Sequence, residues 1–487
     1  MLTGMKKFLA LLALTAPSLR AANQTATVSQ VEITGLPYAI HLETADMGSA
    51  TLPTLQSFAT GYHDGKWVFV AGRTNGLHNF TEDGLVNFPP EYQNAEIWVI
   101  DPAAKLSWSR SLDDPSSGVG ASVFNALSAT ATESVQRGST LYLAGGYLYD
   151  SGSNNFTTYS TLTALDLGGV VNWVQTGSGS LASHVRQTSD PTLQVTGGDL
   201  HLVNDRALLT FGQNFQGPYT PSSSGTYTYQ VRAFDIVDDG NSLSIANVSA
   251  STPQEAFRRR DLNVVPLATG GGPALVALSG VFTETGGAWT VPVEISADGM
   301  PSMADPFAPG TFKQAMNGYN TSSMVLYSPS RDENHVVLLG GISLQTYESG
   351  TFVTDNNLPF TSQGSSIVRE ADGTYTQYYL GDVYPDIIDG GTGEPLLFGA
   401  ESVFLRNHAL SLSHGLIDLD SLAGPTLLGY VFGGIAAEQP NFGATAASNL
   451  LFEVWYTPVP EPGALGLLLG GSALLLARRR VFRRAGG

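Results

Sequence analysis

Between its two ends the chain is patterned for β-strands. Apolar residues alternate with polar ones or gather in runs of about four to eight, and Gly, Asn, Asp and Pro separate the runs. Such runs occupy residues 67–72, 97–100, 141–146, 162–166 and 172–174. We find no convincing amphipathic helix in this part of the sequence. The pattern therefore predicts an all-β body.

One strand type recurs along the body, an apolar strand that ends in glycine. It is found at residues 70–72, 143–146, 209–212, 277–280, 337–341 and 430–434, about 60 to 90 residues apart. Propeller blades are usually about 40 to 50 residues long, and here the extra length lies in polar loops such as 217–225 and 347–364. Glycine is expected where the backbone turns sharply and neighbouring repeats leave no room for a Cβ atom.

This repeat resembles the Kelch repeat, in which the second strand ends in a Gly-Gly doublet and an aromatic residue and a Trp follow. The clearest match runs from residue 135 to Gly146 and continues through Tyr159 to Trp173. The doublet is single at Gly72, Gly212 and Gly280, and the downstream Trp is missing from the third and fifth repeats. The resemblance implies a Kelch-like β-propeller of six blades over residues 23–457. An array of β-sandwiches with glycine-rich turns is the alternative.

The two ends of the body are expected to meet. Residues 31–34 and 38–40 are strand-like and precede the first glycine-ended strand, whereas the last repeat, which ends at 451–456, is one strand short. A strand from the N-terminal end would complete the last blade and remove an exposed sheet edge.

The N-terminus has the pattern of a signal peptide. Lys6 and Lys7 precede an apolar stretch at 8–16, and small residues follow around Ser18 and Ala21. This arrangement predicts a signal peptide over residues 1–22, removed by signal peptidase, and hence an exported protein.

The C-terminus carries a second targeting pattern. A short proline-containing box is followed by an apolar stretch at 464–477 and an arginine cluster; its defining residues are Val459, Pro460, Glu461, Pro462, Arg478, Arg479 and Arg480. Fourteen residues of helix cover about 21 Å, less than the roughly 30 Å of a bilayer core, which favours a transient anchor over a permanent one. Arginines beside a span stay in the cytoplasm, so the body should face outward.

These C-terminal features resemble the PEP-CTERM sorting signal of Gram-negative bacteria. The resemblance covers residues 458–487 and implies a short transmembrane helix that is cleaved by an exosortase near residues 460–462. It also implies an association with exopolysaccharide and biofilm, and a path from the inner membrane to the cell surface or the extracellular space.

Charge narrows the choice of partners. The chain has a net charge of −19, and the body without its two ends keeps 15 basic and 41 acidic residues, a net charge of −26. Nucleic acid and anionic lipid surfaces are bound through basic patches, so the composition argues against both as partners of the body.

The absence of cysteine excludes several chemistries. With no Cys in the chain, disulfides, thiolate metal sites and a cysteine nucleophile are impossible. The superfamily that the body resembles includes galactose oxidase, but the Tyr–Cys copper cofactor of that enzyme cannot form here. Neither a nucleophile elbow nor a nucleotide-binding loop is present, and no catalytic residues are predicted.

One acidic loop has the chemistry of a calcium site. Its oxygen ligands would be Asp382, Asp386, Asp389 and Glu394. The loop lacks the ligand spacing of an EF-hand, and in so acidic a chain an ordinary solvated turn is the competing interpretation. No other cofactor is predicted.

These observations favour a binding protein over an enzyme. We expect a cell-surface or extracellular-matrix protein that binds extracellular polysaccharide or another surface protein; an extracellular carbohydrate-active enzyme on a propeller scaffold is the alternative. Aromatic rings in the loops can stack on the apolar faces of sugars, and hydroxyl and amide groups can hydrogen-bond to sugar hydroxyls. The candidates for these contacts are Tyr147, Tyr149, Asn154, Asn155, Tyr219, Tyr227 and Tyr229. The negative charge favours neutral or cation-bridged glycans.

Overall fold

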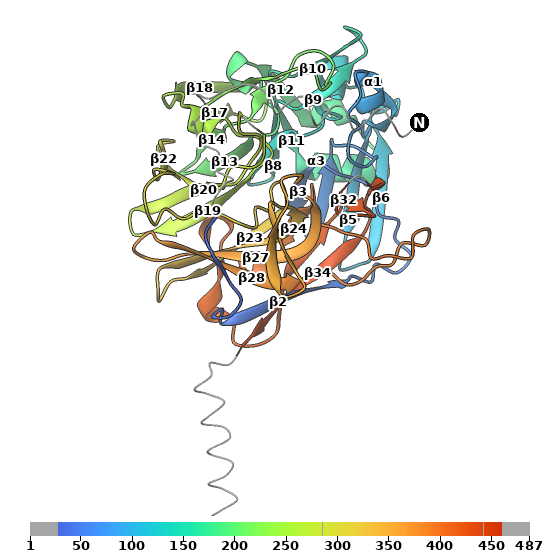
Figure 1. Ribbon diagram of the computed structural model, residues 1–487. Helices are drawn as coiled ribbons and strands as arrows, with labels where there is room; N and C mark the ends of the chain where they lie inside the picture. Colours follow the sequence, from blue (N-terminus) through green and yellow to red (C-terminus); the bar gives the residue numbers. More distant parts are fainter. Residues whose placement is uncertain (1–27, 285, 442, 460–487) are drawn as a thin grey trace, which may run out of the picture.

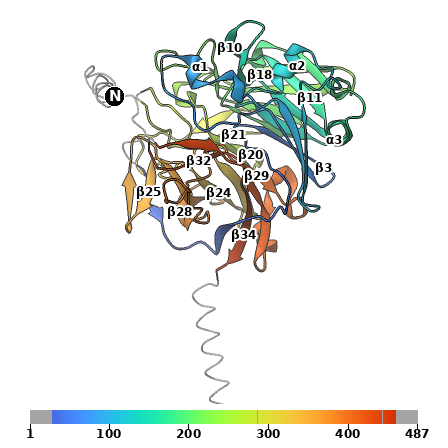
Figure 2. The ribbon, with the colours of Figure 1, turned by 90° about the vertical axis from the view of Figure 1, so that its right-hand side faces the viewer.

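The computed structural model describes residues 28–284, 286–441 and 443–459, and in these the protein is an all-β propeller (Figure 1). Five four-stranded antiparallel sheets and one six-stranded sheet follow one another in chain order. A second view shows the same arrangement from the side (Figure 2). In four of these sheets all four strands are hydrogen-bonded neighbours in chain order, as in a meander, and in the other two a strand from the N-terminal part of the described chain lies at an edge.

The strands have the following bounds. The first sheet contains β3 (Ala59–His63), β4 (Lys66–Val70), β5 (Glu96–Asp101) and β6 (Leu106–Ser111). The second contains β7 (Glu133–Arg137), β8 (Thr140–Ala144), β11 (Thr161–Asp166) and β12 (Val185–Ser189). The third contains β13 (Asp199–Val203), β14 (Arg206–Thr210), β17 (Val231–Asp238) and β18 (Leu243–Ala250). The fourth sheet contains β19 (Asn263–Thr269), β20 (Gly272–Leu278), β21 (Val293–Ser296) and β22 (Pro301–Met303).

The fifth sheet is larger, and the prediction of six blades is corrected accordingly to five regular four-stranded blades. Its central strands are β23 (Ser322–Ser328), β24 (Glu333–Ile342), β27 (Phe360–Arg369) and β28 (Tyr375–Asp382). Two short strands, β1 (Val31–Glu32) and β30 (Ile417–Asp418), add to its edges in parallel and make it six-stranded. These additions come from distant parts of the chain, so the repeat pattern did not reveal them.

The last sheet closes the ring as predicted. It contains β29 (Val403–Arg406), β31 (Thr426–Phe432), β34 (Leu451–Pro458) and, from the other end of the body, β2 (Tyr38–Thr44). Strand β2 pairs antiparallel with β34 from Tyr38 opposite Pro458 to Thr44 opposite Phe452. Tyr38, Ile40 and Leu42 are buried while the residues between them are exposed, so the period-two pattern of this strand sets its register.

One predicted strand is wrong, because residues 172–174 belong to helix α3 (Leu167–Thr176). Leu167, Val170, Val171 and Val174 are spaced i, i+3, i+4, i+7 and all are buried, which is the stripe of an amphipathic helix. The neighbouring glycines and the Trp masked this spacing in the sequence. Gly177, in the left-handed region at φ 69°, ends the helix. The other helices are α1 (Gly84–Asn87) and α2 (Ala121–Ala126).

The glycine-ended strands are the second strands of the large sheets, where adjacent sheets approach most closely. Gly145 follows β8 with φ 66°, and a Cβ atom there would lie 2.0 Å from the carbonyl oxygen of Val195 in the next repeat. No side chain fits at that distance. The predicted reason for glycine at this point of the repeat is therefore confirmed.

The excess length of the repeats lies on one face. Antiparallel strands alternate in direction, so the connections between second and third strands share a face. They carry four hairpins, β9 (Tyr147–Asp150) with β10 (Asn155–Thr158), β15 (Gln213–Asn214) with β16 (Thr226–Tyr227), β25 (Gln345–Glu348) with β26 (Thr351–Thr354), and β32 (Ile435–Ala437) with β33 (Thr445–Ala447). Helix α1 occupies the corresponding connection of the first sheet. We call this the hairpin face.

Ring closure by β2 should carry a large share of the stability of the last sheet. Replacing buried Leu42 by Ala is expected to lower the free energy of unfolding by about 2 to 5 kcal/mol, because it leaves a cavity in the closing seam. Glu43→Ala, on the exposed side of the same strand, should change it by less than about 0.5 kcal/mol. Chemical denaturation measures both. Equal effects would show that the β2–β34 seam is not part of the folded core.

Candidate functional site

A large cavity opens on the hairpin face, where the connections from all the large sheets converge. It has a volume of about 1140 Å³. Its walls come from residues as far apart in sequence as Gln56 and Thr445. Large concave sites with both apolar and polar walls are where small ligands bind. We call this the central cavity.

A ring of structurally equivalent residues, one before the first strand of each large sheet, lies at the floor of the central cavity, and all of them except Asn320 line it. They share a left-handed backbone, with φ between 46° and 68°, and are Ser57, Ala131, Gly197, Asp261, Asn320 and Glu401. Backbone hydrogen bonds link neighbours of this inner ring: Ala131 N donates to Ser57 O (3.2 Å), Asp261 N to Gly197 O (2.8 Å) and Glu401 N to Asn320 O (2.7 Å). The repeat geometry thus places unrelated side chains around one axis.

The side chains of the inner ring are distributed unevenly. Ala131 and Gly197 are small and leave space, whereas Asn320, Glu401 and Ser57 form a continuous hydrogen-bonded arc. Asn320 Nδ2 donates to Glu401 Oε1, and the Ser57 hydroxyl oxygen lies 2.5 Å from Glu401 Oε2. The hydroxyl of Ser57 also contacts the side-chain oxygen of Gln56.

The direction of the hydrogen bonds in this arc depends on the protonation of Glu401. Gln56 Nε2 donates to the carbonyl oxygens of Asn75 (3.3 Å) and Gly76 (3.4 Å), so Gln56 Oε1 is the atom that faces Ser57. That oxygen only accepts, so it competes with Glu401 Oε2 for the one hydrogen of the Ser57 hydroxyl. Ser57 donates to an ionised Glu401, whereas a protonated Glu401 can donate to Ser57 and leave the Ser57 hydrogen for Gln56.

Burial raises the pKa of Glu401 from its ordinary 4.5 to about 7, and the nearby Asp261 carboxylate adds to the rise. Hydrogen bonds from Ser57 and Asn320 oppose it only in part. Glu401 is therefore a carboxylic acid, able to donate as well as accept, over the acidic half of the physiological pH range.

The two arginines of the cavity are already engaged. Burial would lower the pKa of Arg260, but the adjacent Asp261 carboxylate raises it, and Arg260 also donates to the hydroxyl oxygens of Tyr227 and Tyr219, each at 3.2 Å. Arg73 donates to Asn75 Oδ1 (3.0 Å) and Pro89 O (2.9 Å) and is 3% exposed. Neither guanidinium is arranged to receive an anionic ligand.

Aromatic rings form the wall above Ala131 and Gly197. Phe88, Tyr147, Phe215 and Tyr219 contact one another with ring centroids 5.1 to 5.7 Å apart. His78 packs against the same wall, 4.8 Å from the Tyr219 ring, and burial lowers its pKa to about 4, so it is neutral at pH 7. The rim adds the exposed rings of Phe80, Tyr92 and Phe282.

The predicted sugar-binding candidates are only partly brought together. Tyr147 and Tyr219 line the central cavity, whereas Tyr149, Asn154 and Asn155 lie on the β9–β10 hairpin, where the Tyr149 hydroxyl donates to Asn154 Oδ1 (2.5 Å). Tyr227 supports Arg260, and the Tyr229 ring lies 6.2 Å from that of Tyr227.

Sequence reasoning missed Ser57, Asp261 and Glu401. A signal for their position was present in the sequence. Ser57, Ala131 and Gly197 each lie 15 residues before the glycine that ends the glycine-ended strand of their repeat, which is Gly72, Gly146 or Gly212. Aligning the repeats on these glycines would have exposed the inner ring. The different loop lengths of the later repeats hide the register.

The four candidate calcium ligands are not assembled into a site. Asp389 caps its own turn by accepting from the backbone N–H groups of Gly391 (2.8 Å) and Thr392 (2.7 Å). Nowhere in the described part of the chain do three His, Asp or Glu side chains gather where they could hold a metal ion, and Asp382, Asp386 and Glu394 form no such group with Asp389.

No family model matches the chain, and no curated protein matches it significantly. A structure search returns "Structure of YjhT", with a TM-score of 0.44 and 12% identity, covering 83% of this chain and 96% of that one.

The targeting segments lie mostly outside the described residues. This holds for the signal peptide at 1–22 and for Pro460, Glu461, Pro462 and the arginine cluster; Val459 is described and donates its N–H to Pro37 O (2.8 Å). Within the described ranges no helix is long and apolar enough to cross a membrane.

The raised pKa of Glu401 predicts a stability that depends on pH. Its folded pKa, about 7, exceeds its ordinary 4.5, so the stabilisation from the bound proton is complete below 4.5 and is lost as pH rises through 7. Gln at 401 keeps a donor for Ser57 and an acceptor for Asn320 without titrating. We expect Glu401→Gln to raise the thermal midpoint by several degrees at about pH 8.5 and by less at about pH 5.

Exposed Glu255→Gln serves as the control for this measurement, since it makes the same change of charge outside the cavity. Thermal unfolding followed by circular dichroism across the pH range compares the three proteins. A difference between Glu401→Gln and the unmodified protein that stays constant with pH would contradict a protonated Glu401.

Proposed function

We propose that this is an exported surface protein whose propeller binds a neutral glycan in the central cavity. One observation carries the proposal. Among the large exposed hydrophobic side chains described, four are aromatic, and three of these, Phe80, Tyr92 and Phe282, line this cavity. Exposed rings cost free energy in water unless a ligand covers them, and the apolar face of a sugar ring is such a ligand.

The polar arc opposite the rings fits the other side of a sugar. Glu401, Ser57 and Gln56 offer oxygen atoms at the floor, and hydroxyl groups can donate to and accept from such atoms. An aromatic wall facing a polar arc suits a ligand that is apolar on its faces and polar at its edges. Carbohydrates have that division.

The ligand should be uncharged. Arg260 is paired with Asp261, and Arg73 is held by Asn75 and Pro89, so no cation is left for a carboxylate or sulfate group. The body carries a net charge of −26, which repels anionic polymers at low salt. Extracellular polysaccharide of a neutral type is therefore the proposed partner; a surface protein is the second candidate.

We also propose that the propeller is of the Kelch type and that its C-terminal signal is a PEP-CTERM signal cleaved by an exosortase. The glycine-ended second strand of every large sheet supports the first point. For the second, β34 begins at the hairpin face and ends at Pro458 on the opposite face, at the lower edge of both views (Figures 1 and 2). A membrane-held tail would then leave the central cavity facing outward.

A ring at the rim should contribute measurably to binding. Replacing Phe80 by Ala is expected to weaken binding of the host's extracellular polysaccharide about threefold to tenfold, as for one aromatic contact. Phe307→Ala is the matched control, because Phe307 is as exposed (68% against 66%) and lies outside the cavity. Isothermal titration compares the affinities, and equal losses for the two variants would refute the assignment of the site.

Incubation of the protein with the host's extracellular polysaccharide distinguishes binding from catalysis. Polymer size and the number of reducing ends should stay unchanged. The protonated Glu401 beside an ionised Asp261–Arg260 pair is the feature that favours the enzyme alternative. Turnover that survives purification and disappears in Glu401→Gln would move the protein into the class of carbohydrate-active enzymes.

Sorting is testable separately. Cleavage near the Pro-Glu-Pro box should give a released protein whose C-terminus lies near residue 460, detectable by intact-mass analysis. A mature form that retains Arg478, Arg479 and Arg480 would identify the tail as an ordinary anchor.

A further inference from the structure

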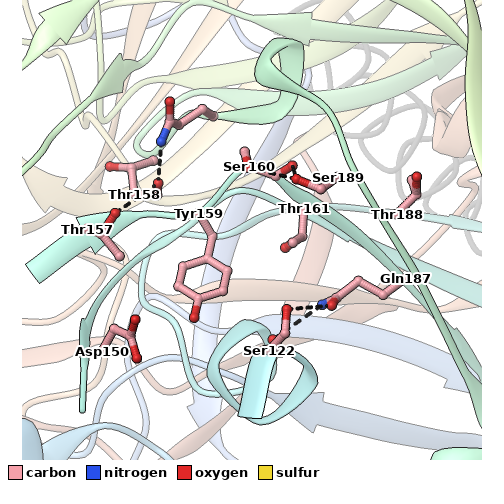
Figure 3. Close-up of a pocket in the computed structure, with 11 residues that line it drawn as sticks. Ser122, Asp150, Thr157, Thr158, Tyr159, Ser160, Thr161, Gln187, Thr188 and Ser189 are labelled. Atoms are coloured by element: carbon pink, nitrogen blue, oxygen red, sulfur yellow. Dashed lines mark hydrogen bonds between the residues drawn. The ribbon is translucent and has the colours of Figure 1, made fainter. Parts of the chain in front are cut away.

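A second concave site lies beside the β9–β10 hairpin (Figure 3). It has a volume of about 430 Å³, and its walls come from β9, β10, β11, β12 and α2. We call it the outer pocket. The hairpin contributes to both sites, since Tyr147 lines the central cavity while Asp150, Thr157 and Thr158 line the outer pocket.

The floor of the outer pocket holds an unsatisfied hydroxyl group. Thr161 is 7% exposed, and its Oγ1 is buried with no hydrogen-bond partner anywhere in the described part of the chain. Its backbone lies within the sheet, where it is opposite Ser189 and its carbonyl oxygen accepts from Gly145 N (3.0 Å). A buried hydroxyl without a partner destabilises a protein. Such a group at the floor of a pocket indicates that a ligand completes it.

Two further groups around Thr161 have capacity left for a ligand. Tyr159 accepts from Asn125 Nδ2 (2.5 Å), which leaves its own O–H to donate. Asp150 accepts from Asn125, Gly152 and Ser153, and although burial alone would raise its pKa, these hydrogen bonds hold the pKa below the ordinary value. Figure 3 shows the Tyr159 ring between Asp150 and Thr161.

Most of the remaining polar side chains of the pocket are already hydrogen-bonded. Ser122 Oγ donates to Gln187 Oε1 (2.7 Å), and Gln187 Nε2 donates to Thr163 Oγ1 (2.9 Å). The hydroxyls of Ser160 and Ser189 lie 2.9 Å apart, and Thr158 Oγ1 donates to Phe215 O (2.8 Å). These bonds fix the wall, and the groups on which the inference rests are a carboxylate acceptor, a phenol donor and the Thr161 hydroxyl.

We infer that the outer pocket is a second sugar subsite that takes one neutral, hydroxyl-rich residue of a glycan. Asp150 accepts sugar hydroxyls, Tyr159 donates and offers its ring, and a hydroxyl that reaches the floor pairs with Thr161. The only charged side chain of the lining is a carboxylate, which excludes acidic sugars. The inference shares its ligand class with the proposed function, but it concerns other residues and is tested separately.

Thr161→Val tests the inference, because Val keeps the shape of Thr and removes the hydroxyl. Without ligand, the variant should be at least as stable as the unmodified protein, since an unpaired buried hydroxyl is lost. Its affinity for a small neutral probe, the methyl glycosides of glucose, galactose and mannose, should fall about tenfold, the effect of one hydrogen bond at a buried site. Saturation-transfer NMR and thermal unfolding on the full-length protein measure the two quantities.

Thr210→Val is the matched control. The hydroxyl of Thr210 is also buried without a partner in the described residues, but Thr210 lines neither the central cavity nor the outer pocket. It should gain stability like Thr161→Val and bind the glycosides unchanged. Asp150→Asn supplies a second test at the pocket and should also lose affinity, because a carboxylate accepts hydroxyl groups more strongly than an amide does.

The outcomes separate the two sites. The loss caused by Thr161→Val should persist when Phe80→Ala has weakened the central cavity. If Phe80→Ala abolishes glycoside binding and Thr161→Val does not change it, the cavity binds sugar and the outer pocket does not. No binding of any of the three glycosides, or a lower stability of unliganded Thr161→Val, would equally overturn the inference.

Discussion

Close approach of the sheets at the centre of the propeller is the constraint on which the rest of the structure depends. At Gly72 and Gly434 a Cβ atom would lie 2.6 and 2.4 Å from a carbonyl oxygen of another segment, so the second strands of these two sheets must end in glycine. Because the sheets meet so tightly, the residues just before their first strands also converge. They form the inner ring that becomes the floor of the central cavity.

This convergence gives the inner ring its electrostatics. Glu401 and Asp261 come from different sheets, yet the Asp261 carboxylate raises the pKa of Glu401 because both are buried at the same axis. The hydrogen-bonded arc from Asn320 to Gln56 has a donor for every acceptor when Glu401 is protonated. A propeller thus brings together groups that no single repeat contains, and the same symmetry leaves Ala131 and Gly197 as open space for a ligand.

On the hairpin face, the sheets act as a scaffold and the loops between their strands line the two concave sites. The sheets supply rigid positions, while the insertions between second and third strands supply most of the aromatic rings of the central cavity and part of the wall of the outer pocket. The β9–β10 hairpin is central to this division, since Tyr147 and Thr158 are paired across its two strands and belong to different sites. A glycan that contacts both sites would be held on the two sides of one hairpin.

The sequence by itself determined the strand content, the glycine-ended second strands and the closure of the ring by β2, because these follow from local alternation and from backbone space. Helix α3 is also encoded by local sequence, in the spacing of its buried residues, but its glycines made the segment look unlike a helix. The buried residues are Leu167, Val170, Val171 and Val174. Only the tertiary structure decided the parallel additions β1 and β30, which enlarge one sheet beyond the repeat. It also decided the central cavity, since Ser57, Asp261 and Glu401 become neighbours only when the ring closes, and the burial that shifts the pKa of Glu401 does not exist before then.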